Sequence, residues 1–488
     1  MLYTYVISFA SAIGGFLFGY EIGVVDQIFE MQDFGLRFGL REYDPVSGDL
    51  VLSGSNAAIK GNITFIFLLG CAFGSLCVGA LLADSIGRKR SILVGATFFG
   101  FGGLAQAFVN HLTWFYVGRV TSGIGIGVLS MVVPMYISET APTAIRGRMV
   151  AVQQLMVTIG ILFAAVINLL IRAQEDGNER EWRIALAVQS VPGFLLMFIM
   201  LFMPCSPRWL ENCGRHIEAR NTLARIRSAS PNSSAVIVEY KAIKDGIERE
   251  RLVGDASWSE ILRPGVVNRV ALAIMLQVFQ QWTGMNFILY YASSLFEKMG
   301  FDYETASTKL NIINAVVNVA GTLPGMYLIE RSGRRPLLIY GGFAMGISHF
   351  LVCLFTGLSH ESSSLSWGAV FFVYTFILSY ASTWGPTVWV YQSEIFPLRI
   401  RAKGSGLATF FNWIMNALIG KLTPLALESI DFYLYAVFGG IGIAMGLFAI
   451  FFVPETVGKS LEDMDLLFGP TMEPVDLDLE GKDKESLS

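Results

Sequence analysis

The stretch ADSIGRK at residues 83–89 decides the fold, because it returns in altered form as IERSGRR at residues 329–335. Each copy follows an apolar segment of helical length and combines an acid, a glycine and paired cations. The two copies lie about half a chain apart, at matching points of two hydrophobic halves. Such a duplication predicts a membrane bundle built from two repeats around a central site.

The composition indicates the same class of protein. Hydrophobic residues make up 53% of the 488 positions and charged residues only 15%, which is too apolar for a soluble chain. Apolar windows of about 20 residues recur, with charges confined to the joints between them. We predict an all-α membrane protein with twelve transmembrane helices in two six-helix bundles. The expected spans lie near residues 5–28, 61–83, 91–110, 113–137, 149–171, 184–203, 268–296, 309–330, 336–357, 367–391, 403–427 and 433–453.

Four units follow from this pattern: an N-terminal six-helix bundle over 1–203, a cytoplasmic helical linker over 204–266, a C-terminal six-helix bundle over 267–454 and a tail over 455–488. The linker mixes charge with apolar residues at helical spacing, as at Ala219, Leu223 and Ile226. The tail is acidic and lacks apolar periodicity, so we expect most of it to be disordered.

The joints also predict the orientation of the chain. Their cations fall on one side of the predicted membrane: Arg88, Lys89, Arg90, Arg146, Arg148, Arg334, Arg335, Arg399, Arg401 and Lys403. By the positive-inside rule that side is cytoplasmic, and an even number of spans places both termini there. The first apolar segment is longer than a signal peptide and carries Glu21, so it is expected to stay as a helix. The five cysteines show no metal-binding spacing, and we expect no metal, cofactor or nucleic-acid partner.

Several further phrases accompany the repeat. In chain order they are FGYE at 18–21, PMYISETAP at 134–142 with RGR at 146–148, PCSPRWL at 204–210, QQWTGMN at 280–286, SEIFP at 393–397 and PETVG at 454–458. Together they resemble the sugar-porter family of the major facilitator superfamily, in particular its fungal-type monosaccharide transporters. The resemblance extends from the first span to Glu455.

Uncharged polar side chains lie at depths where hydrocarbon would disfavour them. Gln277 and Asn416 belong to this set, together with the amides that are named at the end of this paragraph. Amides donate and accept hydrogen bonds at once, as the hydroxyls of a sugar require, and indoles stack on the apolar faces of a pyranose. The alternative is that the amides only join neighbouring helices. The Gly385-Pro386 pair is expected to break the tenth helix. The resemblance implies sugar contacts at Gln154, Gln280, Gln281, Asn286, Asn318, Trp389, Asn412 and Trp413, and gating by Tyr290, Tyr291 and Trp384.

Glu21 stands inside the first predicted span, where a carboxylate is unfavourable unless it is paired or protonated. Arg119, near the start of the fourth span, is its natural partner. Proton symporters of the resembling family carry an aspartate and an arginine at these positions, which implies proton coupling by Glu21 and Arg119. The longer glutamate departs from that pattern. The alternative is a fixed structural pair in a facilitator that does not couple protons.

The loop acids and cations are expected to pair across the cytoplasmic side and to separate when that side opens. The alternative is that the cations only enforce topology. The resemblance implies a charge network that stabilises the outward-facing state, formed by Asp84, Arg88, Glu139, Arg146, Glu330, Arg334, Glu394 and Arg401. Cys205 stands where the family usually has a glutamate, which removes one candidate member.

These observations predict transmembrane transport of a monosaccharide, with hexose favoured over pentose or polyol, by alternating access and with proton symport. The expected partners are the sugar, protons and the lipid bilayer, and a monomer is favoured. The membrane is expected to be the plasma membrane. The alternatives are an uncoupled sugar facilitator and a sugar sensor of the same fold that does not transport. An enzyme is not expected, because no nucleophile–base set or phosphate-cradling loop is present.

Overall fold

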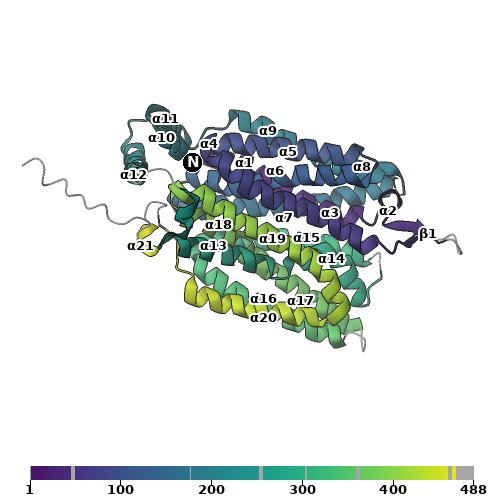
Figure 1. Ribbon diagram of the computed structural model, residues 1–488. Coiled ribbons are helices and arrows are strands. Elements are labelled where there is room, and N and C mark those ends of the chain that lie inside the picture. The colour runs from purple at the N-terminus through teal and green to yellow at the C-terminus, as the bar shows by residue number, and fades with distance from the viewer. Residues whose placement is uncertain are drawn as a thin grey trace, which may run out of the picture.

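The computed structural model describes residues 2–44, 50–175, 177–251, 257–302, 305–358, 363–459 and 464–468. Long helices run side by side along one direction, and a small group of shorter helices stands at one end (Figure 1). The other end carries α2 (Gln32–Phe38) and an antiparallel hairpin of β1 (Arg41–Tyr43) and β2 (Leu50–Leu52). We call these ends the linker face and the hairpin face.

The first bundle is formed by the helices that precede residue 203. They are α1 (Leu2–Ile28), α3 (Asn56–Phe73) continued through a π-helical turn (Gly74–Gly79) into α4 (Ala80–Ser85), α5 (Arg88–Phe108), α6 (Leu112–Thr140), α7 (Arg146–Glu175), and α8 (Glu179–Val188) continued by α9 (Ser190–Phe202). A 3-10 turn (Thr143–Ile145) leads into α7.

The second bundle repeats this order. It contains α13 (Val266–Gln281) with α14 (Met285–Lys298), α15 (Asn311–Arg331), α16 (Arg334–Leu358), α17 (Ser363–Ser382) with α18 (Trp384–Ile395), α19 (Leu398–Ile430) and α20 (Tyr433–Phe452). A 3-10 turn (Trp258–Leu262) precedes α13 and a π-helical turn (Thr305–Leu310) precedes α15.

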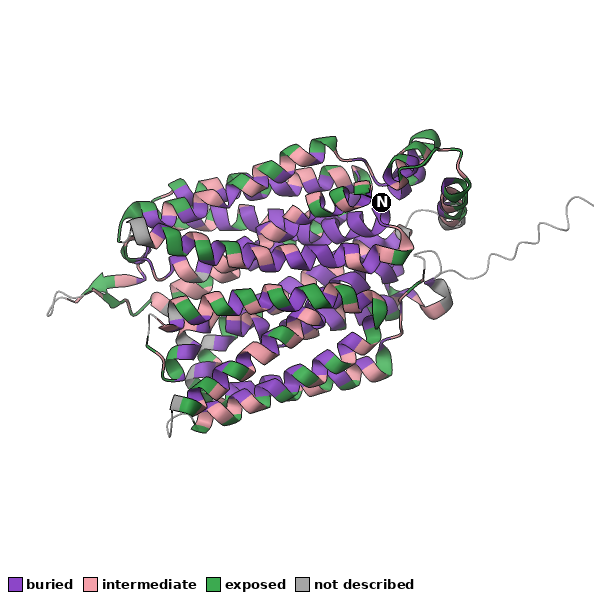
Figure 2. Cartoon of the chain, turned by 180° about the vertical axis from the view of Figure 1, so that it is seen from behind, coloured by how far each residue is buried: buried purple, intermediate pink, exposed green. Residues whose placement is uncertain are grey.

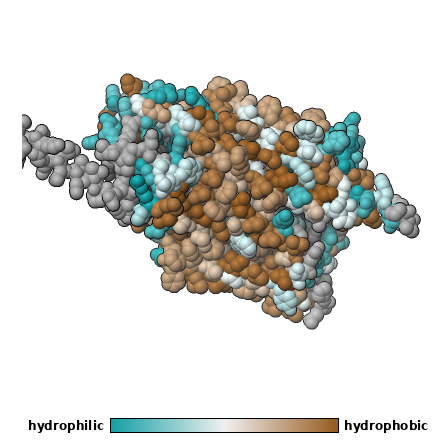
Figure 3. Space-filling model, in the orientation of Figure 1, coloured by the Kyte–Doolittle hydropathy of each residue, from teal (hydrophilic) through white to brown (hydrophobic). Residues whose placement is uncertain are grey.

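Within the described residues, ten helical segments are long and apolar enough to cross a membrane. The other two predicted spans correspond to α13 and α14, each of which is too short to cross a membrane by itself after the break between them, and to α19, whose polar residues lower its hydropathy. The twelve-helix membrane fold predicted from the sequence is confirmed. On the face drawn in Figure 3, apolar residues cover the middle of the molecule and hydrophilic residues gather toward both ends. Exposed positions lie on the outer surfaces of the helices (Figure 2), and large apolar side chains such as Phe101, Phe198 and Phe371 are among them, as lipid contact requires.

The linker face carries α10 (Pro207–Asn212), α11 (His216–Arg227) and α12 (Ser234–Arg251), and the N-terminus lies at the same face (Figure 1). Helices α11 and α12 pack through a small core of their own, made by Leu223, Ala224, Val236, Ile243 and Ile247. The described part of the tail ends in α21 (Asp465–Phe468). The prediction of a disordered tail falls mainly on residues outside the described ranges.

Two helix breaks shape the space between the bundles. Helix α13 ends at Gln281, and Gly284 adopts φ +90°, where an added Cβ would also lie 2.9 Å from Nε2 of His349. The second break, expected at Gly385-Pro386, occurs at Thr383, where φ is −128° and ψ is −87°. Pro386 lies in the first turn of α18, where its missing N–H interrupts no helical hydrogen bond.

Candidate functional site

A pocket lies between the two bundles. Helices α1 and α7 line it from the first bundle, and α13 to α15 and α17 to α19 line it from the second. Its polar and aromatic lining is Phe18, Gln154, Gln280, Gln281, Asn286, Asn318, Tyr380, Trp389 and Asn416. Its aliphatic lining is Ile22, Val157, Ile161, Met285 and Leu289. The structure therefore gathers six of the eight predicted sugar-contact residues around one cavity.

The helix breaks orient the amides of this pocket. Gln280 Nε2 donates to the carbonyls of Trp384 and Gly385, at 3.1 Å each, beside the break before α18. Asn412 Nδ2 donates to Gln280 Oε1 at 3.1 Å from the other side. Gln281 and Asn286 hydrogen-bond to each other across the break between α13 and α14. Gln280, Gln281 and Asn286 are thus oriented before any ligand arrives, which reduces the entropy that binding must overcome.

The two remaining predicted contacts stand behind the pocket wall. Asn412 holds Gln280 as described, and also donates to Gln277 Oε1 at 2.6 Å. Trp413 is fully buried and donates to Ser130 Oγ of the first bundle at 3.2 Å. Its ring meets the ring of Phe18 edge-on, with centroids 4.9 Å apart. Both residues therefore support lining side chains in this conformation.

The predicted gating residues separate into two groups. Tyr290 OH donates to Asn416 Oδ1 at 3.1 Å, and Tyr291 OH donates to the Gly420 carbonyl at 2.8 Å, both on the hairpin-face side of the pocket. The backbone of Tyr291 leaves the helical region within α14, with φ −131° and ψ 20°. Trp384 is buried inside the second bundle, where its indole donates to the Leu338 carbonyl at 2.9 Å.

Sequence reasoning missed Phe18, Tyr380 and the aliphatic walls of the pocket as site residues. An apolar residue within a span looks the same whether it faces lipid, the bundle core or a cavity, so no local signal distinguishes Ile22 or Leu289. Asn416 carries a signal, since it stands one helical turn after Asn412 on α19.

Glu21 and Arg119 form an ion pair in the first bundle, and each is only 1% exposed. Arg119 also donates to the Ile63 carbonyl at 3.3 Å, and its guanidinium carbon lies 4.4 Å from the ring centre of Phe67. Glu21 Oε2 has no hydrogen-bond partner within the described residues. Glu21 directly precedes Ile22 in the sequence, and Ile22 lines the pocket. A carboxylate with one free oxygen in such a place is suited to exchange between an arginine and a proton.

At the linker face, Glu139 at the end of α6 collects cations from both bundles. Arg88 Nη2 approaches Glu139 Oε1 at 3.0 Å, and Arg401 Nη1 from the second bundle approaches the same oxygen at 3.2 Å. Ser206 donates to the other carboxylate oxygen. Asp84 lies 3.7 Å from Arg88, and 4.0 Å from Lys403 of the second bundle.

The second repeat places Arg334 between Glu394 at 2.7 Å and Glu330 at 3.4 Å. Glu330 Oε1 also accepts a hydrogen bond from the backbone N–H of Arg148, in the first bundle, at 2.9 Å. Arg146 donates to Thr143 Oγ1 at 3.2 Å. All eight predicted network residues thus lie at the linker face.

Two membrane bundles closed around one polar pocket define a carrier of the major facilitator type. Residues 7–468 match the family described as "Sugar (and other) transporter". The chain belongs to this family, whose members are transporters and not enzymes.

Known relatives cover nearly the whole chain. The "Low-affinity glucose transporter HXT3" of Saccharomyces cerevisiae is 33% identical over 475 residues, which are 95% of this chain and 82% of the relative. The "Hexose transporter HXT11" of the same yeast is 35% identical over 471 residues, which are 94% of this chain and 81% of the relative.

Solved structures agree. The proton:xylose symporter XylE bound to 6-bromo-6-deoxy-D-glucose superposes with a TM-score of 0.84 at 28% identity, covering 96% of this chain and 99% of XylE. The inward-open conformation of XylE from E. coli gives a TM-score of 0.71 at 27% identity, covering 95% and 99%. The chain is therefore more similar to the sugar-analogue complex than to the inward-open state, consistent with the ion pairs that join the bundles at the linker face.

Proposed function

We propose that this protein carries a monosaccharide, with hexose favoured, across a membrane by alternating access. The observation that carries the proposal is the pocket between the bundles. Six amides line the pocket. The buried charges of Glu21 and Arg119 form an ion pair with each other and do not belong to the pocket lining. Such a set matches an uncharged polyhydroxy ligand, whose hydroxyls both donate and accept. The yeast relatives, named as glucose and hexose transporters, support the same substrate class.

Alternation follows from where the bundles touch. The pocket takes residues from both bundles, so rocking one against the other exposes it to either side. The contacts of Arg401 with Glu139 and of Glu330 with Arg148 join the bundles at the linker face and must separate for that face to open. They act as a latch for the state with this face closed.

We place the linker face in the cytoplasm. It carries the paired cations of both repeats together with Arg399, Arg401 and Lys403, as the positive-inside rule requires. Both chain ends then lie inside the cell, and the plasma membrane is the proposed location.

Proton coupling through Glu21 and Arg119 is the finer part of the proposal. Its support is the buried pair beside the pocket and the similarity to a structure named a proton:xylose symporter. An uncoupled facilitator is the second candidate, favoured by the additional contacts that hold Arg119 in place: hydrogen bonds to the Ile63 carbonyl and to Gln106 Oε1, and a cation–π contact with Phe67.

Radiolabelled glucose uptake into proteoliposomes, with and without an inward proton gradient, separates these outcomes. Symport predicts accumulation above equilibrium that needs the gradient and disappears in Glu21→Gln. Equilibration independent of the gradient would make the protein a facilitator, with Glu21 a structural partner of Arg119. Sugar binding without flux would favour the sensor.

The substrate site is tested by Gln281→Ala in the same vesicles. Losing one fixed amide should weaken apparent sugar affinity by about tenfold, while membrane insertion stays intact. Unchanged uptake kinetics for glucose, galactose and xylose would remove Gln281 from the site.

A further inference from the structure

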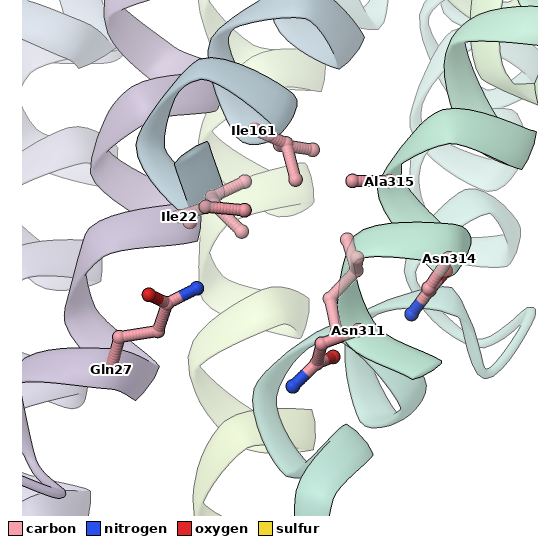
Figure 4. A pocket seen from close by; sticks show the side chains of 9 residues that line it. Ile22, Gln27, Ile161, Asn311, Asn314 and Ala315 are labelled. Atoms are coloured by element: carbon pink, nitrogen blue, oxygen red, sulfur yellow. The ribbon is translucent and has the colours of Figure 1, made fainter. Parts of the chain in front are cut away.

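A second pocket lies between the bundles on the hairpin-face side of the first. Figure 4 shows Gln27 of α1 on the left, Asn311 and Asn314 of α15 further to the right, and Ile22, Ile161 and Ala315 above them. We call this second pocket the outer chamber and the first the central pocket.

The two pockets share part of their walls. Ile22, Ile161 and Leu289 line both of them, on α1, α7 and α14. Ile161 also packs in a small apolar cluster with Ala315, and Leu289 packs against this cluster. Two amide-bearing spaces are therefore separated by an apolar collar formed by Ile22, Ile161 and Leu289. A polar ligand that leaves the hairpin face for the central pocket meets the outer chamber first.

The outer chamber contains an unsatisfied hydrogen-bond acceptor. Asn314 is only 2% exposed, and its Oδ1 has no hydrogen-bond partner within the part of the chain that the structure describes. Leaving such an atom buried without a partner is unfavourable, so a donor from a ligand would be gained there. The neighbouring amide of Asn311 is fixed, because its Nδ2 donates to Ser293 Oγ at 3.1 Å.

The lining differs from that of the central pocket in one respect. The central pocket presents the rings of Phe18, Tyr380 and Trp389 together with its amides. The outer chamber is lined by amides and aliphatic side chains, and no aromatic residue belongs to its described lining. Amides recognise hydroxyls, but without a ring there is no surface for the apolar face of a pyranose. Binding there should be weaker and less selective than in the central pocket.

We infer that the outer chamber is a second sugar subsite, in which Gln27, Asn311 and Asn314 hold a monosaccharide before it crosses the apolar collar. This inference rests on the proposed function and adds a binding step to it. The ligand class is the same uncharged polyhydroxy compound, bound through hydrogen bonds alone.

Saturation-transfer NMR of D-glucose with the full-length protein in lipid nanodiscs detects weak binding and tests the inference. Gln281→Ala combined with Asn286→Ala disables the central pocket and should leave a weak, saturable glucose signal. Adding Asn314→Leu or Gln27→Leu to that variant should weaken the residual binding by about tenfold. Ile313→Ala is the matched control, because Ile313 is 44% exposed on the outer side of the same helix.

Folding is monitored by thermal unfolding of each variant. Asn314→Leu removes an unpaired buried acceptor, so it should leave the unfolding temperature unchanged or raise it while binding falls. Placed in the wild-type chain alone, it should preserve the tight glucose binding of the central pocket.

Loss of all glucose signal in the central-pocket variant would overturn the inference, because the outer chamber would then hold water only. Residual binding that survives both Asn314→Leu and Gln27→Leu would overturn it as well. A wild-type protein that transports glucose in either case leaves the proposed function standing. A wild-type protein that neither binds nor transports any tested sugar would overturn both.

Discussion

The clusters around Glu139 and Glu394 occupy equivalent places in the two repeats, yet they join the bundles differently. In each, a buried arginine that follows the glycine turn pairs with the acid, and a hydroxyl donates to the same acid: Arg88 and Ser206 for Glu139, Arg334 and Thr456 for Glu394. A tyrosine three residues before each acid also repeats its bond, Tyr136 to the Pro204 carbonyl and Tyr391 to the Pro454 carbonyl. The local scaffold is duplicated in detail.

The contact with the opposite bundle is not duplicated. Glu139 takes a second cation, Arg401, from the second bundle. Within the described residues, Glu394 pairs only with Arg334 of its own bundle, and the second repeat reaches across through Glu330 to a backbone N–H of Arg148. One cluster therefore joins the bundles by charge and the other by a hydrogen bond and close packing. The duplicated sequence determines the local structure of each cluster. The interface between the two bundles determines which contact each cluster makes with the opposite bundle.

Glu139→Gln should have the largest effect, because Arg88 and Arg401 are both buried and share this carboxylate. Removing the charge from a buried pair costs about 3 kcal/mol or more. Glu394→Gln is the matched variant, in which Arg334 keeps Glu330 at 3.4 Å and a smaller loss is expected. Thermal unfolding in detergent and sugar uptake measure both. Equal losses in the two variants would show that the asymmetry has no energetic consequence.

Gly147→Ala should weaken closure of the linker face without a large loss of stability. An added Cβ would lie 2.1 Å from Arg334 Nη2 and 2.9 Å from Glu330 Oε1, across the bundle interface. Since Arg334 is held by two acids, the bundles must move apart, and we expect the inward-open population to rise by about tenfold. Labelling of a cysteine introduced into the latch measures this. Gly440→Ala is the control, with no atom within 4 Å of its added Cβ; equal labelling in both would refute the packing contact.

Cys205→Glu should make the first repeat more like the second, with a smaller effect. Glu455 accepts hydrogen bonds from the backbone N–H groups of Arg334 and Arg335 at the start of α16. Cys205 follows Pro204 after the first bundle as Glu455 follows Pro454 after the second, so we expect the substitution to add the matching negative charge near the N-terminus of α5. The expected gain is about 0.3–1 kcal/mol, seen as a higher unfolding temperature. Cys205→Gln controls for size, and an equal gain there would exclude a charge effect.

The smallest effect is expected at Asp33, a partly exposed carboxylate on the hairpin face. Burial alone would raise the pKa of Asp33, but hydrogen bonds from the Trp182 indole and the Arg37 guanidinium outweigh it and lower this pKa below its usual value. A lowered pKa contributes stability that is present above about pH 4 and is lost as the pH falls further. Unfolding temperatures between pH 7 and pH 3 should therefore fall less steeply for Asp33→Asn than for the wild type. Parallel curves for the two proteins would mean that the hydrogen bonds to Asp33 contribute nothing to stability.

Much of the fold could be predicted from the sequence, because lipid imposes long apolar helices and the repeated ADSIGRK and IERSGRR phrases mark the two halves. The break near Pro386 was predicted, because proline cannot continue a helix without losing a hydrogen bond, whereas the break at Gly284, inside the predicted span 268–296, was not. The position of the second break, at Thr383, was also not predicted, because packing between helices decides where the turn is placed.

The sequence by itself determined which residue types the site uses: amides within spans, one buried acid with one arginine, and acids with cations at the joints. Only the tertiary structure decided their arrangement. It put Asn412 and Trp413 behind the pocket wall, and it made aliphatic residues such as Ile22 and Leu289 a collar between two chambers. It also gave Arg401 to Glu139 and left Glu394 with its own bundle. Spacing along one helix fixes which side chains share a face, whereas contacts between helices depend on how two bundles meet.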